Sequence, residues 1–290
     1  MQYRHPGKAF LSRHGLLQTE QDVFRYVEFL RQSAGLSDEP PIDLLRIYQG
    51  FGMPTPLRAP LADQQGILVD SNAGLILIKE DDPLVRQRFT EGHELMELLF
   101  DAQERLLQGI NTQLPWQAEQ KEQLCDRGAA ELLMPTSSFL PQLRSLGFSL
   151  RTGQILANLY QTSLLATLLR MVQHESGAYA VVMWHRALRR REAEGCLPTK
   201  PQPKKKLRVW WRAKAQGWSS GFIPKNKSIR HDSLIAEAFH SGQPQAGSET
   251  LDLGDGLIHC YVEAIPIQLG KKLCVLSLLH LLNSFDSEII

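Results

Sequence analysis

The sequence predicts an α+β fold, and three observations support this class. Apolar residues recur at helical spacing in several segments of the first half, one hairpin signal interrupts them, and strand-like segments dominate the last quarter of the chain. Of the 290 residues, 43% are hydrophobic and 22% are charged, which is typical of a folded chain and excludes a disordered or collagen-like one. At about 150 residues per domain, the length fits about two domains.

Two helices are predicted near the N-terminus. From Gln18 to Ser33 apolar residues recur at helical spacing, and Thr19 is suited to the N-cap position. A second, short helix runs through residues 43–48 and ends at the glycine- and proline-containing segment 50–54. The first domain is therefore expected to begin with helices.

A β-hairpin and two longer helices are predicted next. Residues 66–70 and 75–78 are rich in β-branched and other apolar residues, and a short run of turn-forming residues joins them. Pro83 suits the first turn of a helix that continues to Phe100. Another helix is expected from residue 117 to residue 134, where Pro135 ends it.

The second half begins with helices and continues with strands. Residues 178–184 are a strand candidate, and a Pro-rich basic stretch near residues 198–206 is expected to be an exposed linker. Three strand-like segments and one helix near residues 233–239 then indicate a separate α+β domain. Short helices are predicted at residues 138–146, 151–160 and 163–174.

Charge and composition exclude several classes of partner. The net charge of +1 gives no overall attraction to nucleic acid or to anionic lipid. No apolar stretch approaches the ~20 residues that span a bilayer, and the N-terminus lacks the apolar core of a signal peptide. The 4 cysteines lack CxxC spacing, so neither a zinc finger nor a disulfide framework is indicated. We therefore expect a cytoplasmic protein without a membrane partner.

One short motif has the spacing of a metal site. Residues 92–97 read Gly-His-Glu-Leu-Met-Glu, which places His93 and Glu97 on the same helix face, where both can point at one metal ion. Glu94, one step round the helix, can then reach a water molecule. This is the arrangement of a zinc-peptidase helix, with Glu97 in place of the second histidine. A carboxylate is an acceptable zinc ligand, and one imidazole with carboxylates also suits Mn. The alternative is a solvated helix face.

A third ligand has to come from another helix. In the helix predicted at residues 117–134, Glu122 and Asp126 share a face with apolar residues and are expected to point toward the interior. A core-facing carboxylate needs a partner, and an arginine is the alternative to a metal. The carboxylates on offer are Glu119, Glu122, Asp126 and Glu131, and the arginines are Arg86, Arg88 and Arg127.

Two motifs resemble those of a known family. Residues 86–94 read RQRFTEGHE, and residues 124–135 read LCDRGAAELLMP. This chain thereby resembles the ImmA/IrrE family of metallo-endopeptidases, in which an RxRFTxxHE helix start and an AAxLLMP helix end bracket the metal site. The resemblance covers residues 20–135. The later layout is similar to that of IrrE-like members, by architecture more than by motif.

The resemblance implies a role for each matching residue. Glu94 would be the general base in peptide hydrolysis, and His93 and Glu122 would be metal ligands. Glu97 stands where the family has its second histidine ligand. The implied ion is zinc, with Mn as an alternative. The extra negative charge of Glu97 should make a bound water less acidic than in the usual site.

The resemblance also implies a substrate. It would be a protein, namely a helix-turn-helix (HTH) transcriptional repressor, whose cleavage switches on a stress, DNA-damage or mobile-element response. In peptidases of this architecture an edge strand beside the metal helix pairs with the extended substrate. Leu75, Ile76, Leu77 and Ile78 are the candidates for that strand. The alternative is an ordinary core strand.

Three domains follow from the resemblance. A zincin-like peptidase domain is expected at residues 1–135, a small helical HTH-like module at residues 136–176, and a GAF-like sensor domain at residues 177–290. The GAF-like domain implies a small-molecule or signal ligand, although the sequence names no contact residues for it.

Direct binding of nucleic acid is not expected. The second helix of the HTH-like module, residues 164–170, has too few polar side chains to read base edges. The basic residues 204–206 and the pair Trp210-Trp211 could contact nucleic acid by charge and stacking, but a solvated linker is the favoured interpretation. Glu97 keeps a second function open, in which the chain is a non-catalytic regulator that binds a repressor or DNA.

Overall fold

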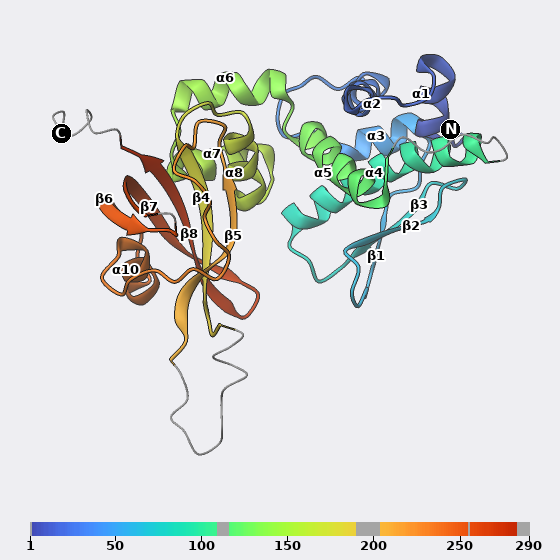
Figure 1. The fold of residues 1–290 in the computed structure, drawn as a ribbon. Helices are drawn as coiled ribbons and strands as arrows, with labels where there is room; N and C mark the ends of the chain where they lie inside the picture. The colour runs from blue at the N-terminus through green and yellow to red at the C-terminus, as the bar shows by residue number, and fades with distance from the viewer. Residues whose placement is uncertain (1, 109–115, 190–203, 255, 283–290) are drawn as a thin grey trace. The chain divides into compact units, whose positions relative to one another are not determined.

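The chain forms two compact units. The computed structural model describes residues 2–108, 116–189, 204–254 and 256–282 (Figure 1). One unit comprises residues 1–146 and 155–166, and the other comprises residues 147–154 and 167–290. Both helices and sheets are present, so the predicted α+β class is confirmed. The functional division at residues 135 and 176 stays a prediction, and most of the basic linker lies outside the described residues.

The helices of the first half are close to those predicted. The helix expected to end at Phe100 continues to Leu107, and a further N-terminal helix was not predicted. That helix has only 9 residues and has His5 at its N-cap instead of a usual capping residue. The bounds are α1 Pro6–His14, α2 Glu20–Ser33, α3 Leu44–Phe51, α4 Leu84–Leu107 and α5 Ala118–Leu133.

Local capping explains where two of these helices begin and end. At the start of α2, the Asp22 carboxylate accepts hydrogen bonds from the backbone N–H groups of Gln18 and Thr19, both at 2.9 Å. The Asp43 carboxylate accepts a bond from the backbone of α3. Helix α3 then ends at Gly52, whose φ of 63° lies in the left-handed region that glycine adopts without strain.

The hairpin belongs to a three-stranded sheet with the order β1-β3-β2. Strands β2 (Gly66–Asp70) and β3 (Leu75–Lys79) are antiparallel, as predicted, and β1 (Leu57–Ala59) pairs with β3 in parallel. The prediction that Leu75, Ile76, Leu77 and Ile78 form an edge strand is therefore wrong. Strand β1 has only 3 residues and no hydrophobic alternation, so the sequence gave no signal for it. It nevertheless pairs with one edge of β3.

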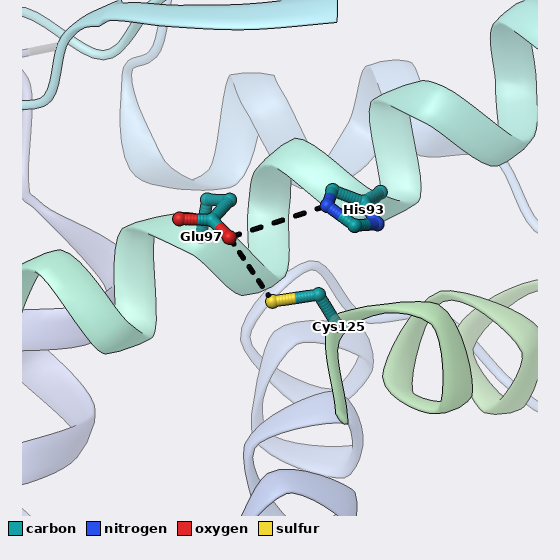
Figure 2. A group of neighbouring side chains, drawn as sticks. All are labelled: His93, Glu97 and Cys125. Atoms are coloured by element: carbon teal, nitrogen blue, oxygen red, sulfur yellow. Dashed lines mark hydrogen bonds and ion pairs between the residues drawn. The ribbon is translucent and has the colours of Figure 1, made fainter. Parts of the chain in front are cut away.

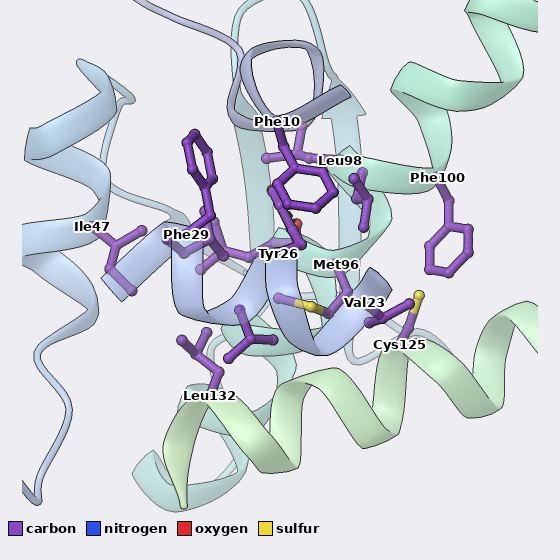
Figure 3. Close-up of a cluster of buried hydrophobic side chains, with 14 of the residues drawn as sticks. Phe10, Val23, Tyr26, Phe29, Ile47, Met96, Leu98, Phe100, Cys125 and Leu132 are labelled. Atoms are coloured by element: carbon purple, nitrogen blue, oxygen red, sulfur yellow. Dashed lines mark hydrogen bonds between the residues drawn. The ribbon is translucent and has the colours of Figure 1, made fainter. Parts of the chain in front are cut away.

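Helix α4 lies at the centre of this unit. It contacts α1, α3 and α5 as well as strands β2 and β3. The core around it is rich in aromatic and aliphatic side chains, including Phe10 of α1, Tyr26 of α2 and Leu98 of α4 itself (Figure 3). Helix α1 approaches α4 so closely that a Cβ on Gly7 would overlap the Leu98 carbonyl oxygen. The course of α4 is therefore held from several sides.

The second unit is built on a five-stranded antiparallel sheet with the order β5-β4-β8-β7-β6. Helix α10 (Leu234–Ser241) contacts β6, β7 and β8 (Figure 1). The buried Trp184 donates from its indole N–H to the Ser277 hydroxyl at 2.8 Å, which satisfies a polar group inside the sheet. The bounds are β4 Tyr179–Ala187, β5 Lys206–Lys214, β6 Gln245–Asp252, β7 Leu257–Leu269 and β8 Lys272–Leu281.

Most of these strands were predicted, but β6 was not. Its sequence, QAGSETLD, is polar and contains glycine, because an edge strand needs few apolar side chains. The three short helices after Pro135 are confirmed as α6 (Thr136–Leu146), α7 (Leu150–Tyr160) and α8 (Leu164–Gln173). Within the described ranges no single helix is long and apolar enough to cross a membrane; α7 and α8 meet that test only when counted together across a sharp bend.

The contact between Gly7 and α4 gives a first prediction. Gly7→Ala should destabilise the protein by about 1–3 kcal/mol, because its Cβ would lie against backbone atoms that cannot move aside. The matched control is Ser12→Ala on the exposed side of the same helix, which should change the stability by less than about 0.5 kcal/mol. Thermal unfolding measures both. Equal melting temperatures for Gly7→Ala and the control would contradict the close approach.

The cap of α1 gives a second prediction, on pH. His5 is buried, and its Nδ1 accepts a bond from the Lys8 backbone at 3.3 Å. Burial, followed by the charge of Lys8, lowers the pKa of His5 to about 4, with Asp101 opposing and Arg105 reinforcing the shift. On acidification, the unfolded chain therefore binds a proton at His5 near pH 6.5, whereas the folded chain binds it only near pH 4.

Stability should accordingly fall on acidification through this window, by up to about 3 kcal/mol. His5→Asn keeps a capping acceptor and removes the titrating ring, so its melting temperature should decline less between pH 6.5 and pH 4.5. The exposed His231 provides the control, since His231→Asn should follow the wild-type curve. Parallel curves for His5→Asn and the wild type would refute this account.

Candidate metal centre

Two glycines bring α4 and α5 close together. A Cβ on Gly92 would lie 3.3 Å from the Cβ of Ala129, and a Cβ on Gly128 would lie 2.6 Å from the sulfur of Met96. Side chains at these positions would push the helices apart. The absence of side chains at these two positions therefore lets residues on the facing sides of α4 and α5 share one site.

Three donor side chains converge where the two helices meet. His93 and Glu97 of α4 and Cys125 of α5 offer ligand atoms that all lie within 4.8 Å of one another (Figure 2). The Nε2 of His93 is 4.0 Å from Oε1 of Glu97. The Cys125 thiol donates to the same carboxylate oxygen at 3.4 Å. The structure thus brings the predicted pair His93 and Glu97 together and adds a cysteine.

The predicted third ligand also faces His93. Oε2 of Glu122 lies 3.5 Å from Nε2 of His93, and Oδ1 of Asp126 lies 3.0 Å from its Nδ1. The Glu122 and Asp126 side chains are 64% and 61% exposed, so the prediction that they point into the core is wrong. Both stand at the rim of the α4–α5 contact, where an apolar face meets solvent.

The arginine partners considered for these carboxylates lie elsewhere. Arg127 pairs with Glu20, and Arg88 donates to the backbone carbonyl of Ile42. Arg86 lies 4.0 Å from Asp82, which comes just before α4. A histidine, and not an arginine, therefore faces the Glu122 and Asp126 carboxylates.

Glu131 is engaged elsewhere and is not a metal ligand. Glu131 accepts hydrogen bonds from the backbone N–H of Thr136 at 3.0 Å and from its hydroxyl at 2.7 Å. Its oxygens therefore support the start of α6.

Lys121 is a site residue that was missed from the sequence. Its ammonium lies 2.7 Å from Oε2 of Glu97 and 3.4 Å from Oε1 of Glu104. Burial lowers the pKa of Lys121, but the hydrogen bonds and charges of Glu97 and Glu104 together outweigh it, and the pKa lies above its ordinary value. A signal existed, since Lys121 precedes Cys125 by one helical repeat of four residues and so shares its face.

The carboxylates raise the proton affinity of His93. Burial lowers the pKa of His93, but the hydrogen bond and charge of Asp126 prevail and raise it above the ordinary value. For Cys125 the charged form is disfavoured. Burial, followed by the Glu97 carboxylate, raises the pKa of its thiol far above the usual range. As described, the site combines an imidazole that favours the charged form with a neutral thiol.

Glu94 is buried between α4 and the sheet. Its side chain is 6% exposed, and burial, opposed by His93 and reinforced by Glu97, raises its pKa to about 7. A Cβ on Gly66 would come within 2.7 Å of Oε1 of Glu94, so this glycine leaves room for the carboxylate. The backbone of Leu68 hydrogen-bonds to Glu94. The edge strand beside the predicted base is therefore β2.

A buried polar cluster supports the first turns of α4. The Glu91 carboxylate accepts a hydrogen bond from the Tyr48 hydroxyl at 3.1 Å and pairs with Arg58 of β1 at 2.5 Å. It thereby ties α4 to α3 and to the sheet, two residues before His93. Sequence reasoning did not find this cluster, because its members lie far apart along the chain.

The donor set fits a zinc ion. Imidazole, carboxylate and thiolate are all zinc ligands, whereas Mn would favour His93 with the carboxylates alone. Cys125 would have to lose its proton to bind, which its raised pKa opposes. The Glu122 side chain is exposed and can reorient toward an ion. We therefore keep Glu122 as the expected third ligand, with Cys125 as the competing one.

Comparison with known proteins agrees with this description. Residues 55–172 match the model of the IrrE N-terminal-like domain, a family of the zinc-metallopeptidase type. That range contains β1 to β3, α4, α5 and every donor named above. The match is consistent with a metallopeptidase type of domain.

A solved structure of a Mycobacterium tuberculosis transcriptional regulator is similar over 99% of this chain and 84% of its own, with a TM-score of 0.55 and 13% sequence identity. At that identity the likeness shows the fold alone. No curated protein matches the chain. The family match over residues 55–172 supports the resemblance to the ImmA/IrrE family that the two sequence motifs indicate.

Metal analysis of single variants distinguishes the two ligand sets. We expect zinc affinity to fall at least about tenfold in His93→Ala and in Glu122→Gln, since even groups behind the ligands commonly contribute that much. Cys125→Ser should bind zinc nearly as well as the wild type. Glu119→Gln, an exposed position on the same helix, is the control. The reverse order, with Cys125→Ser defective and Glu122→Gln normal, would assign the third ligand to the cysteine.

Proposed function

We propose that the chain is a metal-dependent endopeptidase of the cytoplasm that cleaves a protein substrate. One observation carries the proposal: the donors around His93 converge beside a buried Glu94, which in turn lies against a sheet edge. A donor cluster alone could be a structural site. A carboxylate held next to both the donor cluster and an edge strand suits peptide hydrolysis better than a donor cluster alone.

Each residue then has a defined task. His93, Glu97 and Glu122 hold the ion, with zinc favoured and Mn as the alternative. When bound, such an ion lowers the pKa of water and polarises a carbonyl group. Glu94 accepts the proton from the attacking water and returns it to the leaving amine. Its carboxylate is held in place by the Leu68 backbone and by the space that Gly66 leaves.

The substrate backbone is expected along β2. Strand β3 is central, whereas β2 pairs only with β3 among the described strands. An extended peptide can therefore add to β2 by main-chain hydrogen bonds, which replaces the role predicted for residues 75–78. By resemblance to the ImmA/IrrE family the peptide would belong to an HTH transcriptional repressor, and its cleavage would switch on a stress, DNA-damage or mobile-element response.

A single substitution tests the catalytic assignment. Glu94→Gln should abolish cleavage of the host's HTH repressors, because an amide cannot accept the proton, while zinc content stays near that of the wild type. Incubation of each purified repressor with zinc-loaded protein, followed by mass spectrometry, measures cleavage. Glu97→His, which restores the usual histidine pair, is expected to cleave at least as fast as the wild type. Full cleavage by Glu94→Gln would exclude Glu94 as the base.

A second function is favoured by a specific contact. Glu97, which stands where the family has its second histidine, pairs with Lys121 at 2.7 Å and accepts a hydrogen bond from Cys125. Its carboxylate is therefore already engaged by protein groups without a metal ion. A non-catalytic regulator would have this arrangement. In that case elemental analysis should find no metal in the wild type and metal gained by Glu97→His. Binding of a repressor or of duplex DNA, unaffected by chelator, would then establish the regulator.

A further inference from the structure

The second unit contains a cavity of about 720 Å³ that shares no residue with the candidate metal centre. It lies among the end of β4, the start of β5, the segment 227–233, α10 and β6. All these elements belong to one compact unit. Small-molecule sites typically occupy about 300–1,000 Å³, so the size suits an organic ligand and far exceeds a single inorganic ion.

One wall of the cavity is fixed by backbone pairing. Segment 226–229 runs beside the start of β5, with the N–H of Val209 donating to Lys227 at 2.9 Å and the N–H of Ile229 donating to Leu207 at 3.1 Å. The buried Arg208 donates to the backbone carbonyls of Ala187 and Asn226. These bonds join the end of β4, the start of β5 and the segment, so this wall is formed before any ligand arrives.

The wall formed by β6 is tied to the segment 227–233 by side chains. The Ser233 hydroxyl donates to the Glu249 carboxylate of β6 at 3.0 Å. The Lys227 ammonium pairs with Asp252, at the end of β6, at 2.7 Å. The cavity therefore keeps its shape through contacts on both sides.

The lining carries an excess of positive charge. It includes 7 lysine or arginine side chains and only 3 acidic ones. Each acid is already engaged: Asp252 by Lys227, Asp232 by Arg230, and Glu249 by Ser233. Four of the cations, Arg186, Lys204, Lys205 and Lys206, have no ion pair in the part of the chain that the structure describes. Such a cluster of like charges favours an anion between them.

The lining also offers apolar surface. Leu207, Ile229 and Leu251 contribute aliphatic groups, and Phe239 of α10 contributes an aromatic ring. The guanidinium of Arg186 lies 6.0 Å from the centre of that ring. Positive charge and an aromatic face thus meet in one place, which fits a ligand with an anionic end and a planar or apolar body.

We propose that this cavity binds a small organic phosphate of nucleotide size. Arginine and lysine recognise phosphate oxygens by charge-assisted hydrogen bonds, and the aliphatic and aromatic lining accommodates the rest of the molecule. The enclosing walls and the interspersed acidic groups favour a small molecule over a nucleic-acid backbone.

Calorimetric titration of the full chain tests the proposal, with ATP, GTP and pyrophosphate as probes and duplex DNA as the competing polyanion, all at one ionic strength. We expect one site for ATP or GTP, bound at least tenfold more weakly by the double variant Arg186→Glu/Lys206→Glu. Both positions are exposed, so folding should persist, and circular dichroism checks it. Lys271→Glu, an exposed cation outside the lining, should bind within twofold of the wild type.

Other outcomes would overturn the assignment. No binding of either nucleotide, or equal weakening by Lys271→Glu, would reduce the cluster to a non-specific charged surface. Pyrophosphate bound as tightly as ATP would remove the role of the apolar lining. Duplex DNA bound without competition from nucleotides would identify a nucleic-acid surface. The readout is binding and not cleavage, so the result is independent of the proposed peptidase activity.

Discussion

The close packing of α4 against α5 is the constraint on which the rest of the first unit depends. Gly92 and Gly128 allow it, and α1 holds α4 from a further direction through Gly7. Because the two helix backbones approach so closely, His93 and Glu97 reach side chains of α5 without any loop between them. The site is therefore a product of regular secondary structure. Its precision comes from helix packing, which is stiffer than a loop would be.

The negative charges at this site are only partly offset by protein groups. Glu97, Glu122 and Asp126 are opposed by the His93 imidazole and, for Glu97, by the Lys121 ammonium. An entering divalent ion would displace a proton from His93 and would compete with Lys121 for the Glu97 carboxylate. Metal affinity then depends on releasing Lys121 as well as on the ligands, so a metallopeptidase and a regulator can differ by the strength of one ion pair.

Much of this description could be predicted from the sequence. Amphipathic spacing and capping residues located most of the helices, although not α1, and the His93–Glu97 spacing was enough to place both side chains on one face. The central position of β3 in the first sheet could not be predicted, because its neighbour β1 is too short to carry a hydrophobic pattern. The exposure of Glu122 was also missed, since a helix face does not show where a neighbouring helix stops covering it. Lys121 was overlooked because a lysine in an acidic helix resembles an ordinary solvated residue.

The position of Cys125 has a consequence for oxidative damage. Its side chain is fully buried, with 0% exposure, and its neighbour is the Glu97 carboxylate. Peroxides react with the thiolate, and both burial and the adjacent negative charge disfavour that form. Cys260 and Cys274 are buried as well. The protein thus keeps a sulfur atom beside His93 in a form that reacts slowly with peroxides.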